Sequence, residues 1–167
     1  MRNKDFIWKA AYLAAAFAVF LLDQSTKAWA RKTLRFGDDV NVIPGFLNFI
    51  YAQNTGVAFS QFDNGGAVGR WILAALATAA AAAVLYYFWR TPKTEDRVLG
   101  ALSLLLAGIV GNLTDRVRLG YVIDFIDVQL GSWHYPTFNV ADAAICCGAG
   151  LLILDLIFNR KTAAKKR

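Results

Sequence analysis

An uncharged block at residues 71–89, bracketed by Arg70 and Arg90, constrains the fold more than any other feature of the sequence. About 20 consecutive apolar residues in a helix cross the ~30 Å hydrocarbon core of a bilayer. Residues 98–114 form a second uncharged block, and shorter apolar blocks near both ends of the chain continue into polar sequence. We therefore predict an all-α membrane protein with four transmembrane helices, at about residues 8–30, 69–89, 97–116 and 139–158.

The composition is that of one membrane-embedded domain. Hydrophobic residues make up 57% of the 167-residue chain and charged residues 18%, whereas about a quarter of the residues in a soluble domain are charged. A chain of this length is expected to form a single domain, which we place at residues 1–167. The net charge of +6 does not indicate a nucleic-acid partner, because the basic residues flank the apolar blocks instead of lining one polar face.

The lysines and arginines predict the orientation of the helices. Cytoplasmic segments close to helix ends carry an excess of basic residues. With both termini in the cytoplasm, 11 of the 18 basic residues lie in the inner segments. We therefore expect an N-in, C-in topology with two extracytoplasmic segments, at about residues 32–68 and 117–138.

The first extracytoplasmic segment is expected to contain a small β-rich unit. Residues 46–62 carry aromatic and β-branched side chains on both sides of Asn54-Thr55-Gly56, a pattern typical of a strand, a turn and a second strand. Such a unit could cover a site as a lid, cradle an apolar substrate, or pack on the helix ends for stability alone. The sequence leaves these alternatives open.

Polar residues of three predicted helices gather at the extracytoplasmic ends of those helices. Ionisable groups inside a membrane are rare and usually face a bundle interior, where they pair, so this common depth predicts a polar site below the outer surface. Each residue also has an ordinary explanation, such as an acid and a base at i, i+4 or a capping box at a helix start. The residues are Asp23 and Lys27 in the first helix, Asn112, Asp115 and Arg116 in the third, and Asn139 and Asp142 in the fourth.

Two aspartates are the best candidates for catalysis. Asp124 belongs to a short extended run at residues 120–125, and Asp142 opens the fourth helix. Two carboxylates a few ångströms apart share a proton, so one can act as general base on a water and the other as general acid on a carbonyl oxygen. His134 is the single histidine and has no spaced cysteines beside it, so an ordinary zinc site is not expected.

Five blocks of sequence stand in order around the four predicted spans and together cover nearly the whole chain. They are Asp23-Gln24-Ser25-Thr26-Lys27, Gln53-Asn54-Thr55-Gly56-Val57-Ala58-Phe59, Gly108-Ile109-Val110-Gly111-Asn112-Leu113-Thr114-Asp115-Arg116, Gly120-Tyr121-Val122-Ile123-Asp124-Phe125 and Pro136-Thr137-Phe138-Asn139-Val140-Ala141-Asp142. These blocks resemble the motifs of the lipoprotein signal peptidase family, also called signal peptidase II.

The resemblance implies an aspartic endopeptidase of the bacterial cytoplasmic (inner) membrane, multi-pass, with its active site on the extracytoplasmic side. It would remove the signal peptide from prolipoproteins, cutting just before a diacylglyceryl-modified cysteine, with Asp124 and Asp142 as the catalytic dyad. The implied partners are these prolipoproteins, membrane lipid and globomycin-type inhibitors; no metal or organic cofactor is implied, and we expect a monomer. Residues implied to bind or support the substrate or inhibitor are Asp23, Lys27, Asn54, Gly56, Gly108, Asn112, Asp115, Arg116 and Asn139.

Two other functions are compatible with a small membrane protein. An ion- or proton-coupled transporter would use Asp23, Asp115 and Asp142 as a relay, but it needs polar groups through the full membrane depth, and the alanine-rich block at 71–89 has none. A purely structural membrane anchor leaves the common depth of the charged residues unexplained. The peptidase is therefore the function that we predict.

Overall fold

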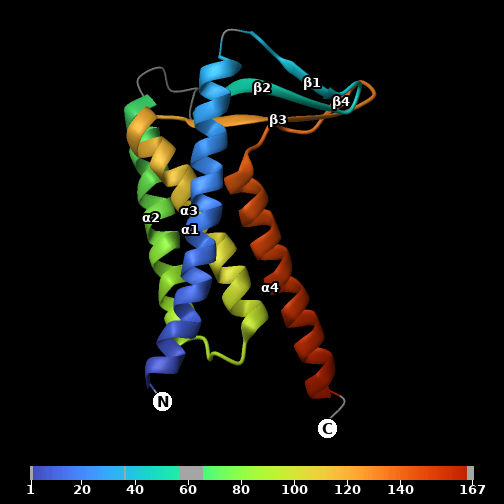
Figure 1. Ribbon diagram of the computed structural model, residues 1–167. Coiled ribbons are helices and arrows are strands. Elements are labelled where there is room, and N and C mark those ends of the chain that lie inside the picture. The colour runs from blue at the N-terminus through green and yellow to red at the C-terminus, as the bar shows by residue number, and fades with distance from the viewer. Residues whose placement is uncertain (1, 36, 57–65, 165–167) are drawn as a thin grey trace.

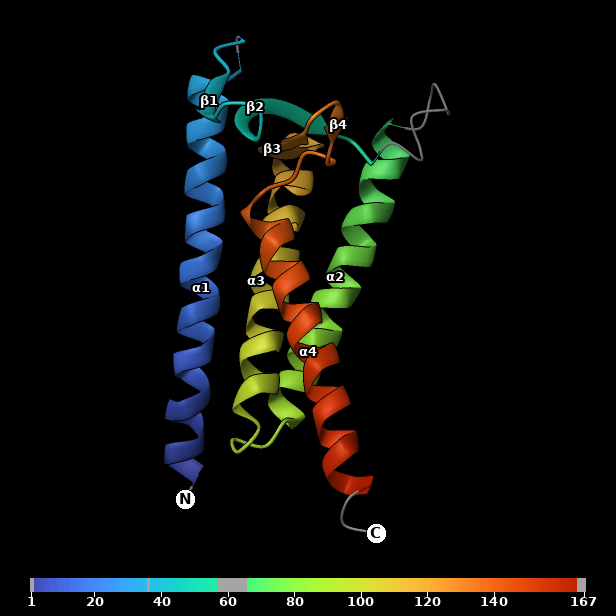
Figure 2. The same cartoon turned by 90° about the vertical axis from the view of Figure 1, so that its right-hand side faces the viewer.

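Four helices stand side by side, and a small sheet lies across one end of them (Figure 1). The computed structural model describes residues 2–35, 37–56 and 66–164. Helix α1 begins and helix α4 ends at the end of the bundle opposite to the sheet, as both views show (Figures 1 and 2). The helices are α1 (Arg2–Thr33), α2 (Gly66–Arg90), α3 (Asp96–Leu119) and α4 (Val140–Ala164).

All four helices are long and apolar enough to cross a membrane, as predicted. Large apolar side chains cover their outer surfaces; on α2, for example, Leu76 is 62% and Tyr87 63% exposed. Exposed apolar area on this scale suits contact with lipid and not with water. The membrane-length stretches are Phe6–Thr33, Val68–Arg90, Asp96–Leu119 and Val140–Phe158.

Helix α3 is the centre of the bundle and packs against each of the other three helices. Its contact with α4 is close because glycines lie at the interface. A Cβ added at Gly108 would collide with the carbonyl oxygen of Ala141, and one added at Gly148 would lie 2.7 Å from the carbonyl oxygen of Ala101. Small residues let membrane helices approach this closely, and the approach brings the sheet-side ends of α3 and α4 together.

The sheet is antiparallel, with strand order β1-β2-β3-β4. Its central pair, β2 and β3, joins the segment after α1 to the segment after α3. The register places Ala52 opposite Asp124 and Asn54 opposite Val122. The end of β2 therefore lies beside the aspartate on β3. The strands are β1 (Val40–Ile43), β2 (Leu47–Asn54), β3 (Val122–Leu130) and β4 (Trp133–His134).

The β-rich unit differs in part from the predicted strand, turn and second strand at residues 46–62. The first predicted strand is β2, but it pairs with β1 before it and with β3 from the other segment. The second predicted strand falls in residues 57–65, outside the described residues. The extended run predicted at 120–125 is confirmed from Val122, where β3 begins, and it continues to Leu130, whereas Gly120 caps the end of α3. Long-range pairing of this kind leaves no signal in a single segment, so local sequence does not reveal it.

Candidate active site

The capping box predicted at the start of α4 is present. Asn139 precedes the first helical residue, and its side-chain oxygen accepts a hydrogen bond from the backbone N–H of Asp142 at 2.9 Å. In return, Oδ2 of Asp142 accepts from the backbone N–H of Asn139 at 3.2 Å. This reciprocal pair satisfies two free N–H groups of the first helical turn. It also fixes the carboxylate of Asp142 at the sheet end of the helix.

Asp124 reaches the same place from the sheet. Its side chain is 3% exposed on β3. One carboxylate oxygen, Oδ1, accepts from Nδ2 of Asn139 at 2.7 Å, and the other, Oδ2, accepts from Nδ2 of Asn54 at 3.0 Å. Two amides from different segments thus hold one buried carboxylate.

Two asparagines connect the aspartates that the sequence analysis selected. Asn112 on α3 donates from Nδ2 to Oδ1 of Asp142 at 2.7 Å. The Nδ2 group of Asn139 lies between Asp124 and Asn112, whose Oδ1 atom is 3.2 Å away. The structure therefore brings Asp124 and Asp142 into one hydrogen-bonded cluster, although they come from a strand and a helix.

Next to this cluster, Lys27 on α1 is surrounded by oxygen atoms. Its ammonium lies 3.0 Å from a carboxylate oxygen of Asp23, 3.0 Å from one of Asp115 and 2.9 Å from Oδ1 of Asn112. The side chain is 2% exposed. All three N–H donors of the ammonium therefore have partners, which is the condition for keeping a lysine charged inside a low-dielectric region. The i, i+4 pairing of Asp23 with Lys27 is confirmed, and it is part of a larger network.

The two acids beside Lys27 also hold neighbouring elements in place. Oδ1 of Asp23 accepts from the backbone N–H of Ala141 in the first turn of α4, at 2.9 Å. Oδ2 of Asp115 accepts from the backbone N–H of Ile123 at 3.2 Å, next to Asp124. An acid near a helix N-terminus is favourable because the free N–H groups and the helix dipole attract negative charge. These contacts position the strand and the helix that carry the two candidate catalytic aspartates.

Gln24 is a site residue that the sequence analysis did not single out. Its side-chain amide donates to Asp23 at 3.0 Å, to Asp115 at 3.2 Å and to the carbonyl of Gly111 at 3.3 Å. Gly111 was also passed over, although a Cβ there would lie 2.6 Å from Oδ2 of Asp23. Both residues lie in the sequence blocks that contain Asp23 and Asn112, and this position is the sequence feature that could have identified them as site residues.

Two further predicted residues, Asn54 and Gly56, lie at the end of β2. The side-chain oxygen of Asn54 accepts from the backbone N–H of Gly56 at 2.9 Å, which leaves its amide group directed to Asp124. Gly56 has φ +81°, and a Cβ there would lie 2.7 Å from Cδ1 of Leu73. A glycine is therefore favoured at this turn for its backbone conformation, and a larger residue would also have to displace the end of the Leu73 side chain.

Arg116 lies at the edge of the cluster. Its Nη1 group donates to the carbonyl oxygen of Asn112 at 3.3 Å, and its charge interacts with those of Asp142 and Asp124. The structure includes all eleven catalytic, binding and support residues that were predicted from the sequence. Ten of them lie in or beside the cluster, and Gly108 lies one helical turn below, where α3 meets α4.

The electrostatic setting makes Asp124 unusual. Burial raises the pKa of Asp124 from 3.8 to about 6; the charge of Asp142 also raises it, whereas hydrogen bonds from Asn54 and Asn139 lower it. Asp124 can therefore take up or release a proton close to neutral pH. A carboxyl that changes its protonation in this range is suited to general acid–base catalysis.

Within the described residues, no group of three or more His, Cys, Asp or Glu side chains has the geometry to hold a metal ion. His134, the single histidine, lies on β4 with its Nδ1 atom 3.0 Å from Asp127. Asp127 also accepts from Asn48 at 3.1 Å. The pKa of Asp127 is lowered, chiefly by the hydrogen bond from His134. This second carboxylate of β3 is therefore engaged within the sheet.

The family model and the similar known proteins described here point to one family. The model of the signal peptidase (SPase) II family matches residues 15–158. The lipoprotein signal peptidase of Polynucleobacter necessarius is 44% identical over 144 residues, which are 85% of this chain and 86% of that protein. The enzyme of the same name from Cellvibrio japonicus is 41% identical over 91% of this chain and 89% of its own length.

A solved structure has the same fold. It is described as a bacterial membrane enzyme determined by the in meso method at 2.3 Å resolution. It matches with a TM-score of 0.80 and 32% sequence identity, over 92% of this chain and 91% of the other. Family model, relatives and fold agree over nearly the whole length, and the chain therefore belongs to the signal peptidase II family, a family of multi-pass bacterial membrane peptidases that cleave prolipoprotein signal peptides.

Proposed function

We propose that this protein is an aspartic endopeptidase in which Asp124 and Asp142 together activate water. It cuts the signal peptide from a prolipoprotein just before a diacylglyceryl-modified cysteine. The observation that carries the proposal is the cluster itself: two carboxyls are linked by Asn112 and Asn139, and burial raises the pKa of Asp124 to about 6. In an ordinary ion-pair network, each carboxylate would instead be matched by a nearby cation.

The chemistry follows the logic of two carboxyls that share one proton. The ionised carboxylate accepts a proton from a water molecule, whose oxygen attacks the carbonyl carbon of the peptide bond. The protonated carboxyl gives its proton to the carbonyl oxygen, so a neutral tetrahedral diol forms. The diol then collapses: the C–N bond breaks, the leaving nitrogen takes a proton from one carboxyl, and a diol hydroxyl returns one to the other. No metal or organic cofactor takes part.

The surrounding residues divide into two groups in this proposal. Asn54, Gly56, Asn112, Arg116 and Asn139 line the site for the substrate or for a globomycin-type inhibitor. Asp23, Lys27, Asp115 and Gly108 support that site by fixing the ends of α1, α3 and α4. The support of Asp115 is direct, because it accepts a hydrogen bond from the backbone at Ile123, next to Asp124.

We further propose that the sheet end of the bundle is extracytoplasmic, with both termini in the cytoplasm, and that residues 1–167 form one monomeric membrane domain. Eleven of the 18 basic residues then lie in inner segments, as the positive-inside rule requires. A lipid-bearing substrate approaches such a site through the bilayer. The exposed aromatic side chains Trp133, at 54% on β4, and Tyr135, at 47% just after it, are of the kind that sit at a membrane–water interface.

The test is cleavage of a purified diacylglyceryl-modified prolipoprotein by wild type, Asp124→Asn and Asp142→Asn, with thermal unfolding checked for each variant. Loss of either carboxyl is expected to reduce kcat/KM by about a thousandfold or more, because general acid–base groups contribute roughly 100- to 10,000-fold each. A folded variant that keeps full activity would remove its aspartate from the chemistry.

A matched control is available on the same strand. Asp127→Asn makes the same change three residues from Asp124, at a carboxylate engaged with His134 and Asn48. We expect this variant to retain activity within a fewfold of wild type. A loss as large as that of Asp124→Asn would mean that the assay reports damage to the sheet, and a wild type that transports protons but does not cleave would favour the transporter.

A further inference from the structure

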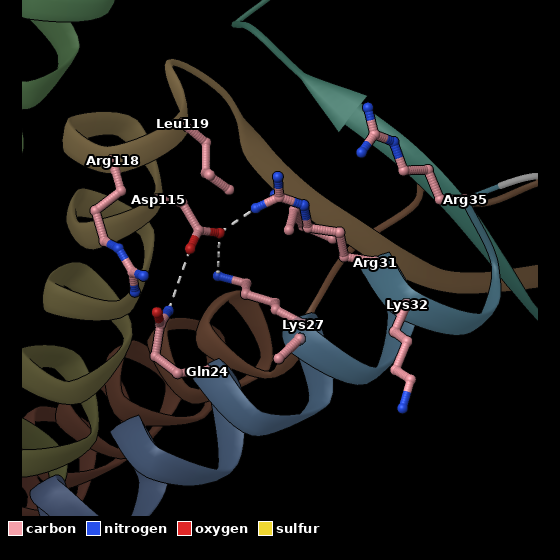
Figure 3. A pocket seen from close by; sticks show the side chains of 10 residues that line it. Gln24, Lys27, Arg31, Lys32, Arg35, Asp115, Arg118 and Leu119 are labelled. Carbon is pink, nitrogen blue, oxygen red and sulfur yellow. Dashed lines mark hydrogen bonds and ion pairs between the residues drawn. The ribbon is translucent and has the colours of Figure 1, made fainter.

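A basic pocket opens between the sheet-side ends of α1 and α3, beside the Lys27 network but apart from Asp124 and Asp142. Its volume is about 450 Å³. Figure 3 shows Lys27 and Arg31 pointing toward Asp115 and Arg118 on the other side of that carboxylate, whereas Lys32 points away from it and Arg35 lies farther off. Five of its lining residues are basic, and one is acidic: Lys27, Arg31, Lys32, Arg35 and Arg118, with Asp115.

The acid cannot balance this charge. The carboxylate of Asp115 already accepts from Lys27, Gln24 and the backbone of Ile123. Arg31, Lys32 and Arg118 are exposed and stand at the last turns of helices that cross the membrane. A pocket of this kind attracts an anion, and guanidinium groups suit phosphate in particular, because their N–H donors match its oxygens in pairs.

An apolar groove of about 310 Å³ runs along the same two helices, toward the middle of the bundle. It is lined on α1 by Phe17, Phe20 and two smaller residues, and on α3 by Leu106, Ala107 and Val110. The groove and the basic pocket lie on one face of α1, because their residues recur at helical spacing, mostly three or four positions apart. The α1 residues concerned are Leu13, Ala16, Phe17, Phe20, Gln24, Lys27, Ala28, Arg31, Lys32 and Arg35.

The spacing between the two features matches one leaflet of a bilayer. Phe17 and Arg31 are fourteen residues apart, which in a helix is about 21 Å. Half of a bilayer with its headgroup regions is also about 20–22 Å thick. When Arg31 stands at phosphate depth, the groove around Phe17 therefore reaches the middle of the membrane.

We propose that the α1–α3 seam binds one anionic glycerophospholipid of the sheet-side leaflet. Its phosphate lies among Arg31, Lys32 and Arg118, and one acyl chain lies in the groove beside Phe17 and Val110. The diacylglyceryl group of the peptidase substrate is a different ligand, since it is attached through a thioether and carries no phosphate. The proposal needs only that the helices span a membrane, and it stands or falls independently of the peptidase mechanism.

Binding at this seam would also connect lipid to the active-site support. Lys27 and Asp115 line the pocket and hold the cluster in place. A phosphate beside Arg31 would take up positive charge that otherwise faces Asp115. Because the phosphate would bridge Arg31 and Lys32 of α1 to Arg118 of α3, the lipid is expected to tighten the contact of α1 with α3.

The experiment uses the purified full-length protein in detergent and a phosphatidylglycerol that carries a photoactivatable diazirine near the end of one acyl chain. Mass spectrometry maps the cross-links. We expect them in residues 13–20 and 106–110, competed by unlabelled phosphatidylglycerol. Diacylglycerol, phosphatidylcholine and inorganic phosphate should compete at least tenfold less well. Equal competition by phosphatidylcholine or diacylglycerol would show that the seam binds lipids without selecting an anionic headgroup. Equal competition by inorganic phosphate would show that the pocket binds free anions and not a lipid.

Two variants locate the headgroup and the chain separately. Lys32→Gln/Arg118→Gln removes two exposed charges and should weaken binding roughly tenfold or more. Val110→Phe fills the groove and should abolish cross-linking there. Arg90→Gln/Arg97→Gln makes the same charge change at the opposite end of the bundle and should leave these cross-links unchanged. Unaltered labelling in both seam variants, or an equal loss in the control, would overturn the proposal.

Discussion

Two pairs of aspartates lie side by side in this protein, and their surroundings differ. Asp23 and Asp115 share the ammonium of Lys27, at 3.0 Å from each. Asp124 and Asp142 are held by amide groups, chiefly those of Asn54, Asn112 and Asn139. The first pair contacts a full positive charge directly, whereas the second pair is hydrogen-bonded by neutral amides and interacts with the charge of Arg116 at the edge of the cluster.

The difference suggests that the two pairs of aspartates serve two purposes, one structural and one that we propose to be catalytic. A carboxylate in contact with a buried ammonium is held in position, because loss of either partner would leave the other unpaired. At Asp124, burial raises the pKa to about 6 although the amide hydrogen bonds of Asn54 and Asn139 lower it, so the proton of this carboxyl can be moved near neutral pH. The first pair therefore joins α1, α3 and α4, and the second is the pair that we propose for acid–base catalysis.

The variant Lys27→Met tests most directly whether Lys27 compensates the charges of Asp23 and Asp115. Removal of one partner from a buried charged network costs about 3–5 kcal/mol, because the remaining charges are left uncompensated. We expect a large fall in the midpoint of thermal unfolding, followed by tryptophan fluorescence in detergent. The triple variant Lys27→Met/Asp23→Asn/Asp115→Asn should recover part of the loss. No recovery would mean that the shape of Lys27, and not its charge, stabilises the bundle.

Close packing around the first pair can be tested with two glycines. Gly111→Ala places a Cβ 2.6 Å from Oδ2 of Asp23 and should destabilise the protein by about 1–3 kcal/mol through overpacking. Gly150→Ala on α4 meets nothing within 4 Å and should be neutral or slightly stabilising. Equal thermal unfolding of the two variants would show that Asp23 moves aside without loss.

A smaller effect is expected in the pH dependence of stability. Because the folded pKa of Asp124 is raised to about 6 from 3.8, the folded state holds more protons than the unfolded state between these values. The stability contributed by protonated Asp124 is full below about pH 4 and is lost as pH rises to about 6. The unfolding midpoint of Asp124→Asn minus that of wild type should therefore increase across this interval and stay level above it. A constant difference from pH 4 to 8 would contradict the raised pKa.

The smallest predicted effect concerns Asn54. The hydrogen bond from Asn54 favours ionised Asp124 and lowers its pKa, so Asn54→Ala should move the pH–rate inflection near 6 to higher pH. The inflection belongs to the coupled pair, not to one residue. Asn48→Ala is the matched control, because Asn48 is on the same strand but bonds to Asp127. Equal shifts in the two variants would show that the strand, not the bond, sets the pKa.

Local features could be predicted from the sequence because they depend on residues that are close together in the chain. The uncharged blocks predicted four helices, since a membrane-crossing helix satisfies its own backbone hydrogen bonds. The capping box of Asn139 and Asp142 needs only three positions of spacing, and it is present as predicted. The common depth of Asp23, Asn112 and Asp142 followed once helix ends were assigned.

Contacts between distant segments could not be predicted from the sequence in the same way. The pairing of β2 with β3 joins residues about 70 positions apart, and the hydrogen bonds of Gln24 with Asp115 depend on how α1 turns toward α3. The basic pocket combines Arg31 with Arg118 across the same seam. From the sequence alone, each of these residues would be assigned to the protein surface and to no site.

The sequence by itself determined the four membrane helices, the family blocks and the candidate aspartates, because hydropathy, spacing and capping act over a few residues. Only the tertiary structure decided which acids share Lys27 and which are held by amides. That division arises where α3 approaches α4 through Gly108 and Gly111 and the sheet sets Asp124 against Asn139. Burial and hydrogen-bond partners are properties of the packed helices and strands, and they, not residue type, distinguish the surroundings of these carboxyls and raise the pKa of Asp124.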